Sequence, residues 1–420
     1  MGSGSRIWYL ARSVTTRRKL AWITLLYFAE GLPLGIVIDN LPVYFRTHGI
    51  SLATIGALSL LRTPWSLKVF WAPVVDQIGA RRQWIRGALI VMAAALIAVA
   101  ALPAAPVGTP LIVALFVFTI AAATQDIAID AYTIELVAPG EEGVANGVRV
   151  SAYRAALVVA GGVLVALPVV TGWPFAFIVA SATLLAVAVV AGRAPATAHT
   201  PQPPREWLRD LRAWLGRRGA LPVFVFVLLY KLDANAIAPM VKPFWLDRGL
   251  SPTDIAFVST TLGVAVSVLG ALIGGWLTSR WGIFHALWIL GLCQAVANLG
   301  YAWAAWADAG RAGIYAASIG ESFGTGLGTA AFLAFLMNVC DKDQAATQYA
   351  FLSSLFGLSG SLSGAWSGRG VEWLGYGNYF ALTFVLAAPS YALLPWVRRW
   401  IREPSDRARA VELPRPAREQ

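Results

Sequence analysis

Acidic residues lie inside long apolar runs of this sequence, where side chains of their type can bind and release protons. A charged side chain costs at least ~2.5–3.5 kcal/mol near the centre of a bilayer unless it faces a polar cavity or a partner. Acids in such runs therefore indicate a polar interior and a chemistry based on proton transfer. The proton-coupling candidates are Glu30, Asp39, Asp126, Asp130 and Glu321.

Two of these acids have a spacing that brings them together. Asp126 and Asp130 are four residues apart and share one helical face. Two close carboxylates in a medium of low dielectric constant resist ionising together, so they can share a proton. The alternative is that Asp130 lies near a helix end and pairs with Arg149 or Arg154.

The other acids differ in their surroundings. Glu321 lies alone among small residues. Glu30 precedes Gly31-Leu32-Pro33, and proline breaks or kinks a helix. Asp39 follows nine residues after Glu30, on the opposite side of a straight helix, so both face one cavity only if the helix is distorted at Pro33.

Four cations in the same runs are candidates for binding an anionic substrate: Arg62, Lys68, Arg154 and Lys231. Arginine can bind a carboxylate through two parallel hydrogen bonds. The alternative is that these cations only neutralise the interior acids.

Composition identifies the elements that must position these residues. The chain has 420 residues, of which 58% are hydrophobic and 13% charged, with a mean hydropathy of +0.64. These values exclude an ordinary soluble enzyme and a disordered scaffold, and the runs are too long and continuous for a β-barrel. We expect twelve helical spans, near 21–45, 54–75, 87–104, 110–138, 144–170, 173–192, 220–243, 254–279, 284–306, 312–340, 345–368 and 378–397.

Lysine and arginine indicate the orientation. With the first segment placed inside, 23 of the 33 Lys and Arg fall in inside segments and 4 in outside loops. Since cytoplasmic loops carry the excess of positive charge, both termini are predicted to be cytoplasmic. The same asymmetry accounts for the pI of about 9.9 without a nucleic-acid partner.

The two halves of the chain repeat each other. His48-Gly49-Ile50-Ser51 corresponds to Arg248-Gly249-Leu250-Ser251. We expect two six-helix halves in a major-facilitator arrangement, with the substrate site at the midplane. The expected parts are a cytoplasmic N-terminus (1–20), an N-terminal bundle (21–192), a basic linker (193–219), a C-terminal bundle (220–400) and a cytoplasmic tail (401–420).

The loop after the second span carries a recognisable pattern. Asp76, Gly79, Arg81 and Arg82 match the D-x-x-G-x-R-R signature found between helices 2 and 3 of major-facilitator proteins. Its Asp and Arg can pair with neighbouring helix ends in one conformational state, so we assign it a conformational role. The alternative is ordinary positive-inside charge.

Enzymatic chemistry finds no support in the sequence. The three histidines fall at or outside span ends, so no nucleophile–His–acid set forms, and no nucleotide-binding loop is present. Cys293 and Cys340 follow no metal-binding or disulfide spacing. We expect no cofactor and no metal, with a proton gradient as the energy source, and a monomer in the lipid bilayer that takes a small anionic or amide-rich solute.

Local motifs resemble the AmpG-type permeases, the muropeptide and acetyl-coenzyme A transporter branch of the major facilitator superfamily. The matching motifs are FAxGLPL (28–34), KxxWxPxxD (68–76), QDIxxDA (125–131), YR (153–154), LYKL (229–232), QxxxNxGY (294–301), Glu321, GxGTxAF (326–332) and ATQxAxLS (346–353). Four amides in these motifs join the cations as substrate-binding candidates: Gln125, Gln294, Asn298 and Gln348.

The resemblance implies proton-driven import of anhydromuramyl-peptide cell-wall fragments across a bacterial inner membrane, for recycling. The chain departs from the muropeptide permeases at Glu30, Asp39, Arg62 and Asp233, which are charged where those permeases carry small or neutral residues. A siderophore importer, an acyl-coenzyme A transporter, a drug transporter and a membrane sensor stay as alternatives.

Overall fold

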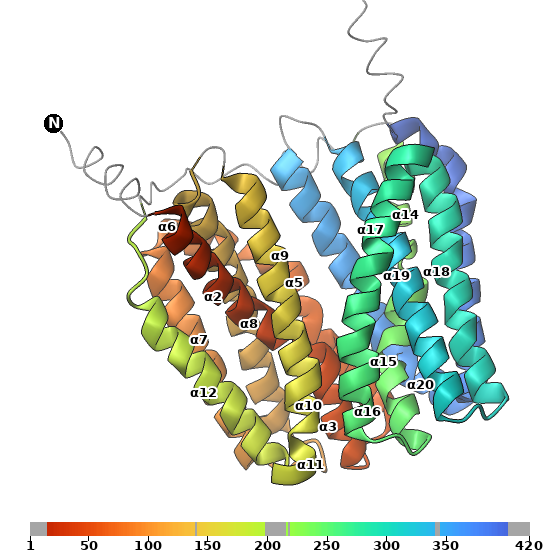
Figure 1. Cartoon of the computed structure of the whole chain (residues 1–420), viewed down its shortest axis with the longest axis horizontal. Coiled ribbons are helices and arrows are strands. Elements are labelled where there is room, and N and C mark those ends of the chain that lie inside the picture. The colour runs from red at the N-terminus through yellow and green to blue at the C-terminus, as the bar shows by residue number, and fades with distance from the viewer. Residues whose placement is uncertain (1–14, 139–140, 198–215, 217–218, 341–344, 402–420) are drawn as a thin grey trace, which may run out of the picture. The chain divides into compact units, whose positions relative to one another are not determined.

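The structure is a computed structural model that describes residues 15–138, 141–197, 216, 219–340 and 345–401 (Figure 1). Within these ranges every regular element is a helix. Ten helical segments of the described chain are long and apolar enough to cross a membrane. The predicted all-helical membrane architecture is confirmed. Most of the predicted N-terminus (1–20), linker (193–219) and tail (401–420) lies outside the described residues.

The first half of the chain contains long helices interrupted by short ones. They are α2 (Thr16–Gly35), the π-helix η1 (Ile36–Asn40), α3 (Leu41–Thr47), α4 (Leu52–Ala57), η2 (Leu58–Arg62), α5 (Thr63–Leu67), η3 (Lys68–Phe70), α6 (Ala72–Gln77), α7 (Arg81–Ala101), α8 (Thr109–Leu136), α9 (Glu142–Val158), η4 (Val159–Val163), α10 (Leu164–Ala166), α11 (Pro168–Thr171) and α12 (Trp173–Ala191).

The second half has fewer interruptions. Its helices are α14 (Ala220–Leu229), α15 (Leu232–Asp247), α16 (Pro252–Asp254), the π-helix η5 (Ile255–Leu262), α17 (Gly263–Trp281), α18 (Ile283–Trp306), α19 (Arg311–Val339), α20 (Ala345–Val397) and η7 (Arg398–Trp400).

Two features explain why the described chain has ten long apolar helical segments where the sequence predicts twelve spans. The predicted span 54–75 is divided among α4, η2, α5, η3 and α6, with Pro64 and Pro73 at the starts of α5 and α6. Proline supplies no backbone N–H, so it favours a new helix start there. The last two predicted spans run together in α20, which bends at Gly375 with φ 73°. Each of the twelve predicted spans therefore overlaps helical chain, although the third and fourth extend past the ends of α7 and α8 at Ala101 and Leu136.

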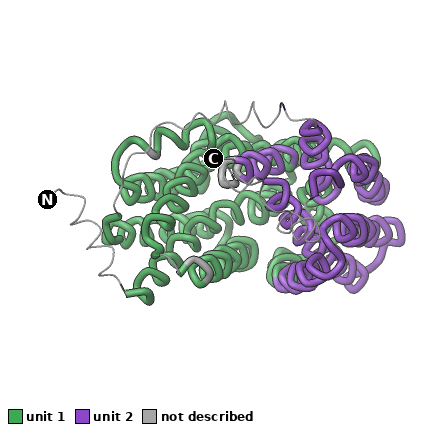
Figure 2. The backbone as a smooth tube through the Cα atoms, turned by 90° about the horizontal axis from the view of Figure 1, so that it is seen from above, with its two compact units in different colours: residues 1–205, 235–264, 360–376 green, residues 206–234, 265–359, 377–420 purple. Residues whose placement is uncertain are grey.

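The chain forms two compact units, and their boundaries differ from the two expected bundles (Figure 2). Unit 1 comprises 1–205, 235–264 and 360–376, and unit 2 comprises 206–234, 265–359 and 377–420. Parts of α15, η5 and α20 belong to unit 1 together with the first half, and the bundles expected at 21–192 and 220–400 stay a prediction. Within unit 1, for example, Gly161 of η4 lies against Asp39 and Thr260.

Close helix packing in unit 1 positions its polar residues. Helix α2 packs against α8 and α9 (Figure 1). A Cβ on Gly31 would lie 2.8 Å from the carbonyl oxygen of Tyr153, so only glycine permits this approach of α2 to α9. The expected distortion of the first span occurs just after Pro33, where α2 widens into the π-helix that holds Asp39. A widened turn rotates the residues that follow it.

Candidate functional site

Charged residues of four helices gather inside unit 1, and we call this group the carboxylate cluster. It comprises Glu30 of α2, Lys68 of η3, Asp126 and Asp130 of α8, and Arg149 of α9. Lys68 Nζ donates to Asp126 Oδ2 in an ion pair. Arg149 Nη2 lies 3.0 Å from Asp130 Oδ1. The predicted common face of Asp126 and Asp130 thus receives two cations from other helices.

Glu30 completes this cluster. Its side chain is buried, and the charges of Asp126 and Asp130 act on its carboxyl group. The Oε2 atom of Glu30 has no hydrogen-bond partner among the described residues. The cluster therefore combines three carboxyl groups with two cations.

Tyr27 supports the more exposed side of the cluster. Its hydroxyl donates to Asp130 Oδ1 over 2.8 Å, and the Arg149 guanidinium lies 4.6 Å from the centre of its ring. The Asp130 and Arg149 side chains are 33% and 42% exposed, against 11% for Asp126. Asp130 thus forms the ion pair that the sequence left as its alternative, and Asp126 is the more enclosed acid.

Asp39 lies apart from the cluster, in an ion pair with Lys242. A second pair lies nearby in sequence, where Arg46 contacts Asp247 through Nε at 2.6 Å and Nη2 at 2.7 Å. The Tyr376 hydroxyl donates to the same Asp247 over 2.7 Å. Both ion pairs join the first span to residues about 200 positions later, all within unit 1.

The two arginines predicted to bind substrate carry no carboxylate partner within the described ranges. Arg62 ends η2 and lies beside Gly360 of α20, with Asn235 on the same side. Arg154 follows Tyr153 on α9, and both guanidinium groups act electrostatically on the Tyr153 phenol. Gln125 is fully buried on α8, and its amide N and O lack partners in the described chain.

Unit 2 has its own buried polar group, the lysine network, which comprises Lys231, Asp233, Gln294, Asn298 and Thr329. Lys231 lies in the break between α14 and α15, and its Nζ donates to Gln294 Oε1 and, over 2.9 Å, to Thr329 Oγ1. Gln294 Nε2 donates in turn to both Asp233 oxygens at 3.2 Å. Asn298 Nδ2 donates to Asp233 Oδ2 over 3.3 Å.

Glu321 of α19 interacts electrostatically with this network but bonds locally. It accepts a 2.9 Å hydrogen bond from Thr325 Oγ1, one helical turn later. Lys231 and Asp233 are the charged groups that act on its carboxyl group. Gln348 of α20 is buried. The structure thus places Lys231, Gln294, Asn298 and Glu321 in unit 2, as separate groups from the carboxylate cluster.

The signature loop joins α6 to α7. Gly79 has φ 70°, a conformation that favours glycine. Buried Arg81 contacts Glu135 over 3.2 Å and donates to the Val75 carbonyl oxygen over 2.8 Å, while Arg82 is exposed. The Asp76 side chain lies outside the described residues. Arg81 therefore ties this loop to the end of α8.

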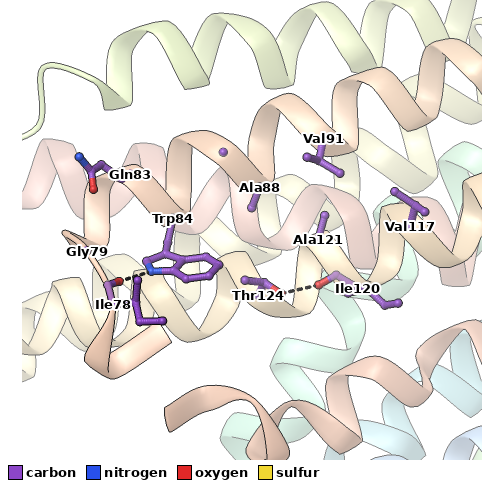
Figure 3. A pocket seen from close by; sticks show the side chains of 11 residues that line it. Ile78, Gly79, Gln83, Trp84, Ala88, Val91, Val117, Ile120, Ala121 and Thr124 are labelled. Atoms are coloured by element: carbon purple, nitrogen blue, oxygen red, sulfur yellow. Dashed lines mark hydrogen bonds between the residues drawn. The ribbon is translucent and has the colours of Figure 1, made fainter. Parts of the chain in front are cut away.

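A pocket of about 500 Å³ lies beside the loop, between α7 and α8 (Figure 3). Trp84 of its wall donates from Nε1 to the Ile78 carbonyl oxygen over 2.6 Å. The other lining side chains include Val91, Val117 and Ile120, all exposed. The lining is mostly apolar and includes none of the charged candidate residues.

Sequence reasoning missed several residues of these groups. Arg149, Tyr27 and Lys242 are not among the site residues that the sequence predicts. Asp233 enters the sequence analysis only as a departure from the family pattern. Asp233 had a usable signal, since it lies two residues after Lys231 in the same apolar run. Tyr27 lies three residues before Glu30, on the same helical face.

Comparisons with known proteins agree with this architecture. Residues 23–364 match the Major Facilitator Superfamily. The anhydromuropeptide permease of Escherichia coli K12 is 31% identical over 389 residues, which cover 89% of this chain and 78% of that protein. A Haemophilus influenzae protein named only as uncharacterized is 31% identical over 405 residues, covering 90% of this chain and 94% of that protein.

Among solved structures, the crystal structure of a bacterial homologue of the human lysosomal transporter Spinster has a similar fold. Its TM-score is 0.72 at 15% sequence identity, and the match covers 96% of this chain and 100% of that chain. At this identity the similarity concerns the fold alone.

Proposed function

Because this chain belongs to the AmpG-type permeases of the Major Facilitator Superfamily, we propose that it imports anhydromuropeptides across the bacterial inner membrane together with protons. The substrate is that of the Escherichia coli relative, whose name specifies anhydromuropeptides. The energy source is the proton gradient, with no bound cofactor.

One observation supports the proton coupling, namely that the carboxylate cluster holds three carboxyl groups against two cations, with Glu30 buried and outside both ion pairs. Lys68 pairs with Asp126 and so favours its ionised form. A proton on Glu30 then balances the charge of the cluster. Loss of that proton leaves Glu30 anionic and repelled by Asp126 and Asp130. Proton release would therefore weaken the contact between α2 and α8.

Uptake of labelled anhydromuropeptide tests this function, in a host that lacks its own permease. The expected result is accumulation that requires an inward proton gradient and stops when an uncoupler is added. The Arg280→Gln variant is the control for the loss of a positive charge, because Arg280 is exposed at the end of α17 and lies outside the candidate site. Accumulation unaffected by the uncoupler contradicts the coupling, and uptake of a ferric siderophore without uptake of anhydromuropeptide contradicts the substrate.

The orientation follows from the charge asymmetry and has its own test. Both termini and the linker are placed in the cytoplasm. A reporter that is active only in the cytoplasm should be active when fused after residue 205 and silent when fused after Arg311. The reverse result contradicts this orientation.

A further inference from the structure

We infer that Arg62, Arg154, Tyr153 and Asn235 form an anion-binding site in unit 1 that takes a carboxylate of the transported molecule. This inference rests on the proposed function and deepens it. It assigns the recognition of the anion to the two arginines, and it excludes the two lysines that the sequence also offers.

The lysines are already engaged. Lys68 forms its ion pair with Asp126, so its charge is neutralised inside the carboxylate cluster. Lys231 is 3% exposed and donates to Gln294 and Thr329. An added carboxylate would have to displace these partners, and breaking a buried pair leaves an uncompensated charge.

Arg62, unlike the two lysines, is not engaged with a partner among the described residues. Its side chain is partly exposed and has no hydrogen bond or ion pair in the ranges that the structure describes. A Cβ on Gly360 would lie 3.2 Å from its Nη2 and 3.3 Å from its Nη1. The guanidinium therefore lies against the α20 backbone, at a point where glycine leaves room for it.

Asn235 brings a polar side chain to the same place. Its Oδ1 lies 3.2 Å from the same Gly360 Cβ position. Its Nδ2 is buried and unpartnered within the described chain, and the residue is 9% exposed. A buried N–H group without an acceptor is costly. An anion bound to Arg62 would supply that acceptor.

Helix α9 contributes Tyr153 and Arg154 to the proposed anion-binding site. Arg154 and Tyr153 are partly exposed, and neither has a hydrogen-bond partner within the described ranges. Both arginines act electrostatically on the Tyr153 phenol. The proposed site would combine two guanidinium ions, an amide N–H and a phenolic O–H. Such a surplus of donors and positive charge fits a carboxylate, which accepts hydrogen bonds from arginine in a bidentate manner.

Tyr153 also connects this site to the carboxylate cluster, because its ring lies against Gly31, the residue after Glu30, where a Cβ would be 3.2 Å from Tyr153 Cδ2. An anion bound at the arginines would repel an ionised Glu30 and so favour its protonated form. Substrate binding and proton binding would then support each other.

The test measures binding to the purified full-length protein in nanodiscs. The probes are an anhydromuropeptide with free carboxylates and the same molecule with its carboxylates amidated. Arg62→Gln and Arg154→Gln should each weaken binding of the free-carboxylate probe by roughly 10- to 100-fold, the loss expected for a charged hydrogen bond. They should change binding of the amidated probe by less than about 3-fold, and Arg280→Gln should change neither.

The outcomes separate this inference from the proposed function. If both arginine variants keep the wild-type preference for the free carboxylate, the arginine site is wrong and the transport function stands. If the wild type binds neither probe, the proposed substrate is wrong, and the carboxylate assignment falls with it.

A second measurement on the wild type applies if the variants fail to fold. The free-carboxylate probe should slow the modification of Arg62 and Arg154 by phenylglyoxal, and the amidated probe should not. Equal modification rates with and without the free-carboxylate probe overturn the inference.

Discussion

The carboxylate cluster of unit 1 and the lysine network of unit 2 stabilise buried charge in different ways. In the cluster, cations contact carboxylates directly, as Lys68 does with Asp126 and Arg149 with Asp130. In the network, the Gln294 amide lies between the charges, accepting from Lys231 and donating to Asp233. Both lysines lie where regular α-helix is interrupted.

This difference has a chemical consequence. An amide neither gains nor loses a proton, so Gln294 separates Lys231 from Asp233 without exchanging a proton itself. The cluster has three carboxyl groups and two cations, so one carboxyl group, that of buried Glu30, is left without a cation of its own. The proposed function assigns proton exchange to the cluster, and the following substitutions test the contrast.

Asp126→Asn should have the largest effect. It removes the partner of Lys68 and leaves a charge uncompensated, with an expected loss of about 3–5 kcal/mol in stability. Gradient-driven accumulation should be lost as well. The measurements are protein level, thermal unfolding and net uptake. The double variant Lys68→Met/Asp126→Asn should recover stability without recovering accumulation, and recovery of both would contradict the role of Asp126 in coupling.

Glu30→Gln and Glu321→Gln compare the two units directly. Glu30→Gln keeps the Lys68–Asp126 pair but cannot release a proton, so proton-driven accumulation should fall at least about 10-fold while substrate exchange continues. Glu321→Gln keeps an oxygen that accepts from Thr325, so its effect should be smaller. Counterflow and net uptake on the same variants measure this. A larger loss in Glu321→Gln would move the proton site to unit 2.

Gln294→Leu should mainly reduce stability. It removes the amide that satisfies both Lys231 and Asp233, with an expected cost of about 1–3 kcal/mol. Unfolding of the purified protein measures the loss. Gln125→Leu is the control, because the Gln125 amide has no partner in the described chain. Equal losses in the two variants would show that the hydrogen bonds of Gln294 contribute little.

We expect the smallest effect on stability from substitution of Glu141, which lies outside the membrane-spanning helices. A hydrogen bond from Thr16, together with bonds from the Ala138 N–H and Lys19, lowers the pKa of Glu141 from 4.5 to about 2. A carboxyl group with a lowered pKa contributes stability above its unfolded value of 4.5, and this is lost as pH falls through about 2.

Thermal unfolding between these pH values measures the contribution of Glu141. Glu141→Gln should flatten the pH dependence slightly and leave uptake at neutral pH unchanged. A change in uptake would mean that this ion pair of Glu141 with Lys19 belongs to the transport mechanism.

The sequence by itself determined the helical class, the positions of the spans and the identity of most polar residues inside them. These properties are local. A run of apolar residues long enough to cross a bilayer must form helix, because lipid offers no hydrogen bonds to the backbone. The shared face of Asp126 and Asp130 likewise follows from helical periodicity alone.

Only the tertiary structure decided which charged residues pair with each other. Lys68 meets Asp126 across 58 positions, and Asp39 meets Lys242 across 203. Such pairs depend on which helices pack together and on how proline and the π-helix rotate each segment, neither of which a single helix encodes. The same packing neutralised the lysines and left Arg62 and Arg154 without a carboxylate among the described residues, because charge balance is set by neighbours in space.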